Sequence, residues 1–284
     1  MILEIINASL LAATPILLAA LGGLYTYHLN VFNIALEGMM LLGAFLGVLG
    51  SYLSGTWVIG LIFGALGALG AGAVFAFFAV YLKTDEFVTG IAINMLSLGG
   101  STYALRQMFH VKGAFIHPDI QSLPLWNLPF FGKLPWLSFA ALGLTALVWI
   151  HLYRTPFGLR LRAAGEDARA ADSAGLNTAR LKIRALLLSG ALCGLSGVFL
   201  SLGYVTLFAE NMSNGRGWIA LAVIILVRGN PLNALLMALF FGFFDGLGLS
   251  LQKVNIPSQF TQMLPYLAAL AALYFYSRTK RKTL

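Results

Sequence analysis

The apolar residues of this chain fall into long runs, and these runs restrict the fold more than any other feature. Each run has about 17 to 25 residues, the length that an α-helix needs to cross roughly 30 Å of hydrocarbon. Stretches such as 61–82 do not alternate apolar and polar residues, as strands of a transmembrane barrel would. We therefore expect an all-α fold, a polytopic bundle of transmembrane helices that forms a single domain over 1–284.

The runs predict about nine spans, within a range of eight to ten. The run at 218–228 is short for a full crossing. It is either half of a broken helix or a span that extends upstream through Gly215 and Arg216. The predicted spans are 5–26, 33–53, 57–82, 87–105, 136–153, 185–207, 218–228, 231–251 and 264–278.

Composition supports a lipid environment and argues against nucleic acid. The chain is 59% hydrophobic and 10% charged, whereas an ordinary soluble domain has roughly 25% charged residues. Its net charge of +8 comes from residues between the apolar runs, and no basic patch is interleaved with aromatic residues. We expect no nucleic-acid partner. We also expect no metal site, because the four histidines lack ligand spacing and the single cysteine, Cys193, lies inside an apolar run.

Lysine and arginine set the expected orientation, because positively charged loops stay on the cytoplasmic side. The segment 154–184 carries seven basic residues: Arg154, Arg160, Arg162, Arg169, Arg180, Lys182 and Arg184. The end of the chain carries Arg278, Lys280, Arg281 and Lys282. Four predicted spans separate the two, so both can be cytoplasmic if the N-terminus lies outside. The segment 106–135 is then the largest external surface.

Small residues four apart predict close helix contacts in the bundle. The pairs are Gly43 and Gly47, Gly60 and Gly64, Gly190 and Gly194, and Gly242 and Gly246. Such spacing lets helix backbones approach one another in lipid.

The sequence lacks the motifs of a membrane enzyme. It has no Gly-x-x-x-x-Gly-Lys-Ser/Thr phosphate loop and no His-Glu-x-x-His zinc motif. Active transport would then draw on an ion gradient or on a separate ATPase. Ion-coupled carriers place several ionisable residues within their spans, and here only Glu37 and Asp245 qualify.

The segment 154–184 is long, charged and organised, which favours a docking element over a solvated basic loop. Asp167 is a candidate N-cap for a short helix over 168–174 whose exposed face is mostly alanine. Gly175 suits the left-handed position that ends such a helix. Thr178 is the candidate cap of the next membrane helix.

Three blocks of residues carry a resemblance to a known family. The first is Asn-Ile-Ala-Leu-Glu-Gly-Met-Met at 33–40, followed by Gly43 and Ala44. The second is Thr-Pro-Phe-Gly-Leu-Arg at 155–160 with Arg-Ala-Ala-Gly-Glu at 162–166, and the third is Gly-Arg-Gly-Trp-Ile-Ala-Leu-Ala at 215–222. In this order the chain resembles the permeases of the branched-chain amino acid, monosaccharide and nucleoside group of ABC importers. It departs from the family at Asp167–Ala168, where Asn-Pro is more common.

The resemblance implies a division of labour among subunits. An ATPase subunit would use ATP and Mg²⁺ and dock on 154–184, a second homologous permease chain would complete a heterodimer, and an extracytoplasmic solute-binding protein would deliver solute. This chain would bind no cofactor and would lie in a bacterial inner membrane. The residues expected to couple ATP hydrolysis to the bundle are Gly158, Arg160, Gly165, Glu166, Asp167, Ala171 and Gly175.

Polar residues on the spans are candidates for the solute pathway, since each is costly in lipid unless it faces a cavity or a partner. Asn33 and Glu37 are one turn apart and follow the polar interruption 25–30, as in a discontinuous helix. Glu37 either lines the pathway or reaches the interface. Asn94 and Ser97 lie on one face of their span and either line the pathway or bond to a neighbouring helix.

Two further charged residues have alternative interpretations. Asp245 either lines the pathway or forms an interhelical ion pair. Arg216 either forms a local salt bridge with Glu210 or contacts the binding protein.

Within the resembled family, the form of the second span is most like the nucleoside and simple-sugar members. We therefore expect the membrane subunit of an ATP-driven importer for nucleosides. A simple sugar or a branched-chain amino acid remains open as the solute. Rival classes are an ion-coupled secondary transporter, which an uncoupler would stop, and a membrane enzyme or scaffold, which no motif supports.

Overall fold

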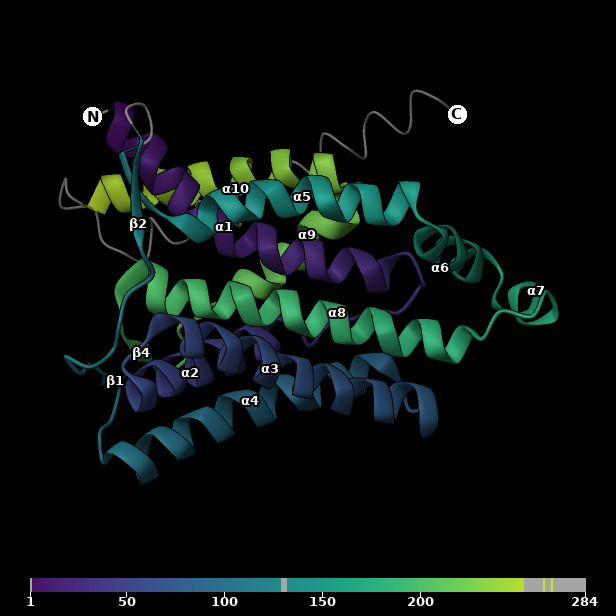
Figure 1. Ribbon diagram of the computed structural model, residues 1–284, viewed down its shortest axis with the longest axis horizontal. Helices are drawn as coiled ribbons and strands as arrows, with labels where there is room; N and C mark the ends of the chain where they lie inside the picture. Colours follow the sequence, from purple (N-terminus) through teal and green to yellow (C-terminus); the bar gives the residue numbers. More distant parts are fainter. Residues whose placement is uncertain (1, 129–131, 253–262, 264–266, 268–284) are drawn as a thin grey trace.

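The computed structural model describes residues 2–128, 132–252, 263 and 267. Long helices lie side by side along one axis (Figure 1). The described α-helices, long and short, are α1 (Ile2–Tyr27), α2 (Leu36–Ser54), α3 (Trp57–Ala76), α4 (Glu86–Phe109), α5 (Trp136–Arg154), α6 (Pro156–Glu166), α7 (Ala168–Ser173), α8 (Thr178–Val198), α9 (Arg216–Leu226) and α10 (Pro231–Gln252). Two π-helical segments, η1 (Phe77–Tyr81) and η2 (Phe199–Val205), extend α3 and α8.

Six of the described helices are long and apolar enough to cross a membrane. They are Ile6–Tyr27, Leu36–Ser54, Trp57–Tyr81, Trp136–Arg154, Thr178–Val205 and Pro231–Gly248. The predicted helical bundle is therefore confirmed, with six of the nine predicted spans present as apolar crossing helices. The span 87–105 lies within α4, which is 24 residues long but less apolar. The span 264–278 falls outside the described residues.

The short run at 218–228 corresponds to α9, which has 11 residues. At 1.5 Å per residue it is about 16 Å long, roughly half of a hydrocarbon core. Arg216 is its first residue, and Gly215 before it has φ +83°, a left-handed conformation that favours glycine. Helix α9 therefore begins at Arg216 and does not extend further upstream.

Helix α1 is the most buried of the six crossing helices and packs against α8, α10 and α9. Helix α2 packs against α3, α8 and α4. The predicted glycine contacts are confirmed. A Cβ on Gly43 would lie 2.6 Å from the backbone of Gly194, and one on Gly194 would lie 2.6 Å from the carbonyl oxygen of Gly64. Glycine is required because backbones of α2, α3 and α8 meet there directly.

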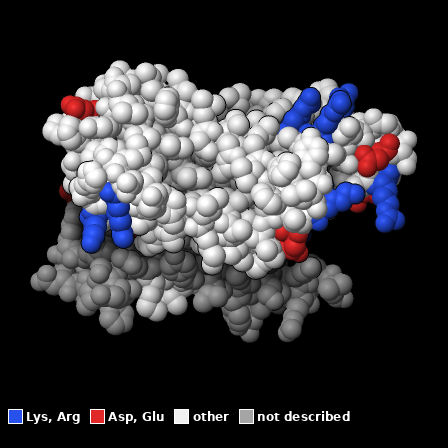
Figure 2. All heavy atoms as spheres, turned by 90° about the horizontal axis from the view of Figure 1, so that it is seen from below, with Lys and Arg blue, Asp and Glu red and all other residues white. Residues whose placement is uncertain are grey.

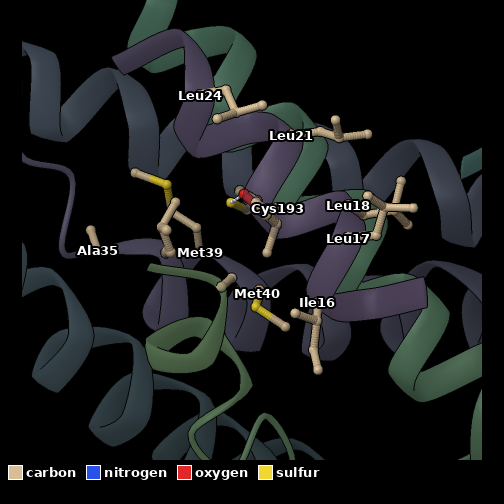
Figure 3. Close-up of a cluster of buried hydrophobic side chains, with 14 of the residues drawn as sticks. Ile16, Leu17, Leu18, Leu21, Leu24, Ala35, Met39, Met40 and Cys193 are labelled. Carbon is tan, nitrogen blue, oxygen red and sulfur yellow. Dashed lines mark hydrogen bonds between the residues drawn. The ribbon is translucent and has the colours of Figure 1, made fainter. Parts of the chain in front are cut away.

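The centre of the bundle is apolar. Figure 3 shows Leu21 and Leu24 of α1 beside Met39 and Met40 of α2 and Cys193 of α8. All five are fully or almost fully buried, so Cys193 is a packing residue of this apolar centre.

The two ends of the bundle differ. Helices α6 and α7 form one end, and the other end carries four short strands that the all-α prediction lacked (Figure 1). These are β1 (Ala114–Phe115), β2 (Leu125–Leu128), β3 (Gly132–Pro135) and β4 (Phe208–Ala209). The pairs β1 with β4 and β2 with β3 are antiparallel, with Phe115 opposite Phe208 and Trp126 opposite Leu134.

On the face shown in Figure 2, the charged side chains of the described residues lie toward the two ends of the molecule rather than at its middle. The middle of that face carries none among the residues that the structure describes. This uncharged band is what a membrane-spanning surface requires.

Candidate functional site

The site is built around the interruption between α1 and α2. After α1 ends at Tyr27, residues 28–35 form turns, and Asn33 lies buried within them. The Asn33 Oδ1 accepts a hydrogen bond from the Ala35 N–H at 3.0 Å, and its Nδ2 donates to Ser189 Oγ of α8 at 3.0 Å. The side chain thus shapes the turn before α2 and ties it to α8.

Glu37, in the first turn of α2, accepts two backbone hydrogen bonds from the start of α9. The Gly215 N–H donates to Oε1 at 2.8 Å, and the Gly217 N–H donates to Oε2 at 2.6 Å. A Cβ on Gly217 would lie 2.6 Å from Glu37 Cα, so the approach requires glycine. The carboxylate lies where the helix N–H groups are unpaired and the helix dipole favours negative charge. The Glu37 side chain therefore joins the first turn of α2 to the first turn of α9.

Arg216, between those two glycines, forms an ion pair with Asp245 of α10 at 3.3 Å between Nη2 and Oδ2. Its guanidinium carbon also lies 5.9 Å from the ring centroid of Tyr204 in η2. Asp245 therefore forms an interhelical ion pair, which was one of the two alternatives for this residue. The predicted local pair of Arg216 with Glu210 is wrong, because Asp245 lies within reach and Glu210 has another partner.

Glu210 instead pairs with Arg106 at the end of α4, with 3.1 Å between Oε1 and Nη2. It also accepts a hydrogen bond from the Gly113 N–H at 3.3 Å. These interactions, the Arg106 bond foremost, hold the pKa of the Glu210 carboxyl below its usual value. Together with the pairing of β1 and β4 they form a clasp that joins α4 to the segment leading into α9.

The polar residues of α4 hold the start of α2. Asn94 Oδ1 accepts from the Gly38 N–H at 2.7 Å, and its Nδ2 donates to the Ile34 carbonyl at 3.0 Å. Ser97 Oγ donates within its own helix to the Ile93 carbonyl at 2.7 Å. A Cβ on Gly38 would lie 2.8 Å from both side chains.

Four of the five pathway candidates therefore meet at the start of α2. They are Asn33, Glu37, Asn94 and Ser97. Asp245 does not bond to this group directly. It pairs with Arg216, whose neighbour Gly217 bonds to Glu37.

The structure also brings in Ser189 and Tyr204, which the sequence did not single out. A serine and a tyrosine in apolar helices carry no spacing that distinguishes them, and the partner of Ser189, Asn33, is 156 positions away.

The segment expected to dock a partner contains two helices. Asp167 caps α7 as predicted: its Oδ1 accepts from Arg169 N–H at 2.9 Å and Ala170 N–H at 3.0 Å. Gly175 has φ +85°, as expected of the residue that ends this unit. The cap of α8 is Asn177 and not Thr178, because Asp172 accepts hydrogen bonds from both the backbone and the hydroxyl of Thr178.

The other expected coupling residues lie on α6 and α7. Arg160 and Glu166 are exposed on α6, and Ala171 is buried on α7. The exposed residues of α7 include Ala168 and Ala170, but they also include Arg169 and Asp172, so the face is mixed in character.

Helix α6 is fitted closely to the bundle at two glycines. A Cβ on Gly158 would lie 2.2 Å from the Leu152 carbonyl oxygen, and one on Gly165 would lie 1.9 Å from that of His28. Asn30 Nδ2 also donates to the Gly165 carbonyl. This contact, which we call the α6 joint, places Gly165 directly on the loop that leads to Asn33 and Glu37.

His28, whose backbone contacts Gly165 in the α6 joint, also connects the joint to the turn after α9. Its Nε2 lies 2.9 Å from the Gly229 carbonyl, in the turn between α9 and α10. Burial lowers the pKa of His28 despite this bond. Because a carbonyl oxygen only accepts, the His28 Nε2–H is the donor.

The chain is similar to known transport proteins along most of its length. The family model for the branched-chain amino acid transport system permease component matches residues 5–273. The guanosine ABC transporter permease protein NupQ of Bacillus subtilis is 33% identical over 95% of this chain and 90% of its own length. The nucleoside ABC transporter permease protein NupC of Lactococcus lactis is 32% identical over 96% of this chain and 92% of its own.

A solved structure shares the fold. It is an ABC transporter in an inward-facing conformation, with a TM-score of 0.54 and 19% identity. The match covers 99% of this chain and 87% of that one.

Proposed function

Because the chain belongs to the family of branched-chain amino acid transport system permease components, we propose that it is the membrane subunit of an ATP-driven importer for nucleosides. The observation that carries this proposal is the likeness to a guanosine and a nucleoside permease, which runs through nearly the whole chain and not through one motif. The chain is a transport subunit and has no ATPase site of its own.

The proposed assembly has four kinds of component. An ATPase subunit binds ATP and Mg²⁺, a second homologous permease pairs with this chain, and a solute-binding protein delivers the solute from outside. The membrane is the inner membrane of a bacterium. The crossing helices and the uncharged band between the charged ends support the membrane assignment.

We place the N-terminus and the strands outside and α6 and α7 in the cytoplasm, in a bundle of about nine spans. The basic residues of 154–184 support this orientation, because they gather at the end of the bundle opposite to β2. The predicted external segment 106–135 contributes β1, β2 and β3 to the strand-bearing end.

The ATPase is proposed to act on α6 and α7, through Gly158, Arg160, Gly165, Glu166, Asp167, Ala171 and Gly175. The exposed residues of α6 and α7 would contact the ATPase. The two glycines of α6, which leave no space against the backbone of α5 and of residues 28–29, would pass its movement to the bundle. In this proposal, the α6 joint is the first contact within the permease that transmits the movement of the ATPase.

The solute is proposed to pass near Asn33, Glu37, Asn94, Ser97 and Asp245. In the observed state the Glu37 carboxylate and the Arg216–Asp245 pair are engaged with protein groups. Opening of the pathway would exchange part of these bonds for bonds to a polar solute, which keeps each polar group satisfied.

Uptake into proteoliposomes that contain all four components tests this function. Radiolabelled guanosine should accumulate in a saturable manner, and an ATPase-dead partner should abolish uptake while an uncoupler leaves it intact. Uptake that survives the dead ATPase but stops with the uncoupler would establish an ion-coupled carrier instead. Uptake of glucose or leucine without guanosine would refute the nucleoside assignment.

A further inference from the structure

A hollow of about 580 Å³ opens at the strand-bearing end of the bundle. Its volume is within the usual range for small-molecule sites, about 300–1,000 Å³. The walls come from the first turns of α1, from the β2–β3 hairpin and from η2. The lining residues are Glu4, Asn7, Ala8, Leu11, Gly132, Lys133 and Tyr204.

The hollow has a defined wall because the hairpin is bonded to α1. Asn7 Nδ2 donates to the Lys133 carbonyl at 3.3 Å. Gly132 has φ +72°, and a Cβ there would lie 3.1 Å from Asn7 Nδ2. The glycine therefore lets the start of β3 approach α1 closely, which places Lys133 at the rim.

The lining combines an aromatic ring with hydrogen-bond donors and acceptors. Glu4 supplies a carboxylate, Asn7 a carboxamide and Lys133 an ammonium, and these groups suit hydroxyls. Tyr204 supplies an aromatic face. Among the described residues that line the hollow, Glu4 and Lys133 carry one charge of each sign, which favours a neutral solute over an ion.

The ring of Tyr204 connects the hollow to the proposed pathway. Arg216 lies 5.9 Å from that ring and pairs with Asp245, and the neighbouring glycines bond to Glu37. We propose that the hollow is the entry site of the chain, where a neutral, hydroxyl-bearing ring solute of the nucleoside class binds before it reaches Glu37. This inference rests on the proposed function, and it adds Glu4, Asn7, Lys133 and Tyr204 as recognition residues.

The first test uses the four-component proteoliposomes and guanosine as the probe. Tyr204→Ala should raise the half-saturating guanosine concentration about threefold to tenfold, since aromatic contacts of this kind have that effect. Tyr204→Phe keeps the ring and should raise the half-saturating concentration less than Tyr204→Ala does. Tyr103→Ala removes a tyrosine that is exposed on α4 and should change nothing. A half-saturating concentration for Tyr204→Ala equal to that of wild type would overturn the proposal.

The second test measures binding directly and does not depend on turnover. Cys193 is buried and is the chain's single cysteine, so a membrane-impermeant maleimide should label only a cysteine introduced at an exposed position. In Ala8→Cys, at a lining position without a hydrogen-bonding side chain, guanosine at about ten times its half-saturating concentration should slow labelling about tenfold, because about one site in eleven stays empty. In Ile116→Cys, which is exposed at the same end but outside the hollow, guanosine should have no effect.

The outcomes separate this inference from the proposed function. Wild-type uptake of guanosine with unprotected labelling of Ala8→Cys would refute the entry site and leave the importer intact. Absence of ATP-driven guanosine uptake by wild type would refute the proposed function and the entry site with it. Protection by glucose but not by guanosine would overturn the nucleoside class.

Discussion

Replacing Glu37 by glutamine tests whether its carboxylate holds α2 and α9 together. Glutamine has almost the same shape, so the substitution leaves the packing around Gly217 unchanged. It removes the negative charge and puts an NH₂ group where one carboxylate oxygen accepted a backbone N–H. One of the two N–H groups then faces another donor.

The magnitude follows from the two bonds. A hydrogen bond to a charged acceptor contributes about 1.5–3 kcal/mol and a neutral one about 0.5–1.5 kcal/mol, so the retained bond weakens by about 1 kcal/mol. The lost bond leaves a part-buried donor unpaired, at a cost of about 1–3 kcal/mol. Together the change should destabilise the folded chain by about 2–4 kcal/mol. The corresponding fall in apparent melting temperature is on the order of 5–10 °C.

Thermal unfolding of the purified chain in detergent, followed by intrinsic fluorescence, measures this fall. Asp119→Asn is the matched control. Its carboxylate is mostly exposed and pairs with His117 on the surface, and exposed pairs contribute about 0–1 kcal/mol. Equal melting temperatures for Glu37→Gln and the control would refute the anchoring role. If such a stable variant also lost uptake, Glu37 would instead act on the solute.

Three further perturbations have defined outcomes. Gly165→Ala should overpack the α6 joint at a cost of about 1–3 kcal/mol and reduce uptake per ATP hydrolysed, whereas Gly143→Ala, at a glycine with open space around it, should leave both unchanged. Asp167→Ala should lower α7 stability by about 1 kcal/mol through loss of its N-cap and weaken ATPase binding in a pull-down. The lowered pKa of Glu210 means that its bond to Arg106 stabilises the clasp above the usual carboxyl pKa and is lost as pH falls through the lowered folded-state value. Hydrogen exchange across β1 and β4, corrected for intrinsic rates, should show this loss on acidification, and Glu210→Gln should abolish the dependence.

Local chemistry explains which features could be predicted from the sequence. Asp167 caps the helix that starts one residue later, and Gly175 ends the unit through its own backbone conformation. Both decisions involve neighbours in the chain, so the residue types are sufficient. Thr178 shows the limit of such reasoning, because Asn177 beside it is an equally good cap and Asp172 took the threonine hydroxyl.

The partners of the polar residues could not be predicted, because they come from distant parts of the chain. Glu37 and Gly217 are 180 positions apart, and Asn33 and Ser189 are 156 apart. The sequence marked Glu37 as unusual because a carboxylate in an apolar span is costly. It could not show that the compensating donors are backbone N–H groups, since these belong to every residue and leave no mark in the sequence.

A continuous series of close contacts links α6 to the start of α9, so a movement of α6 can be transmitted to α9. Gly165 touches the backbone of residues 28–29, the loop 28–35 leads into α2, and Glu37 holds the first turn of α9. Because the glycine contacts leave no room for a methyl group, a displacement of α6 must move the loop or separate from it. The loop is short and its Asn33 is bonded to α8, so movement is directed along α2 toward Glu37. A carboxylate that bonds to a helix N-terminus through two backbone hydrogens can release it without breaking a covalent bond, and we therefore propose this contact as the place where an ATP-driven movement opens a path.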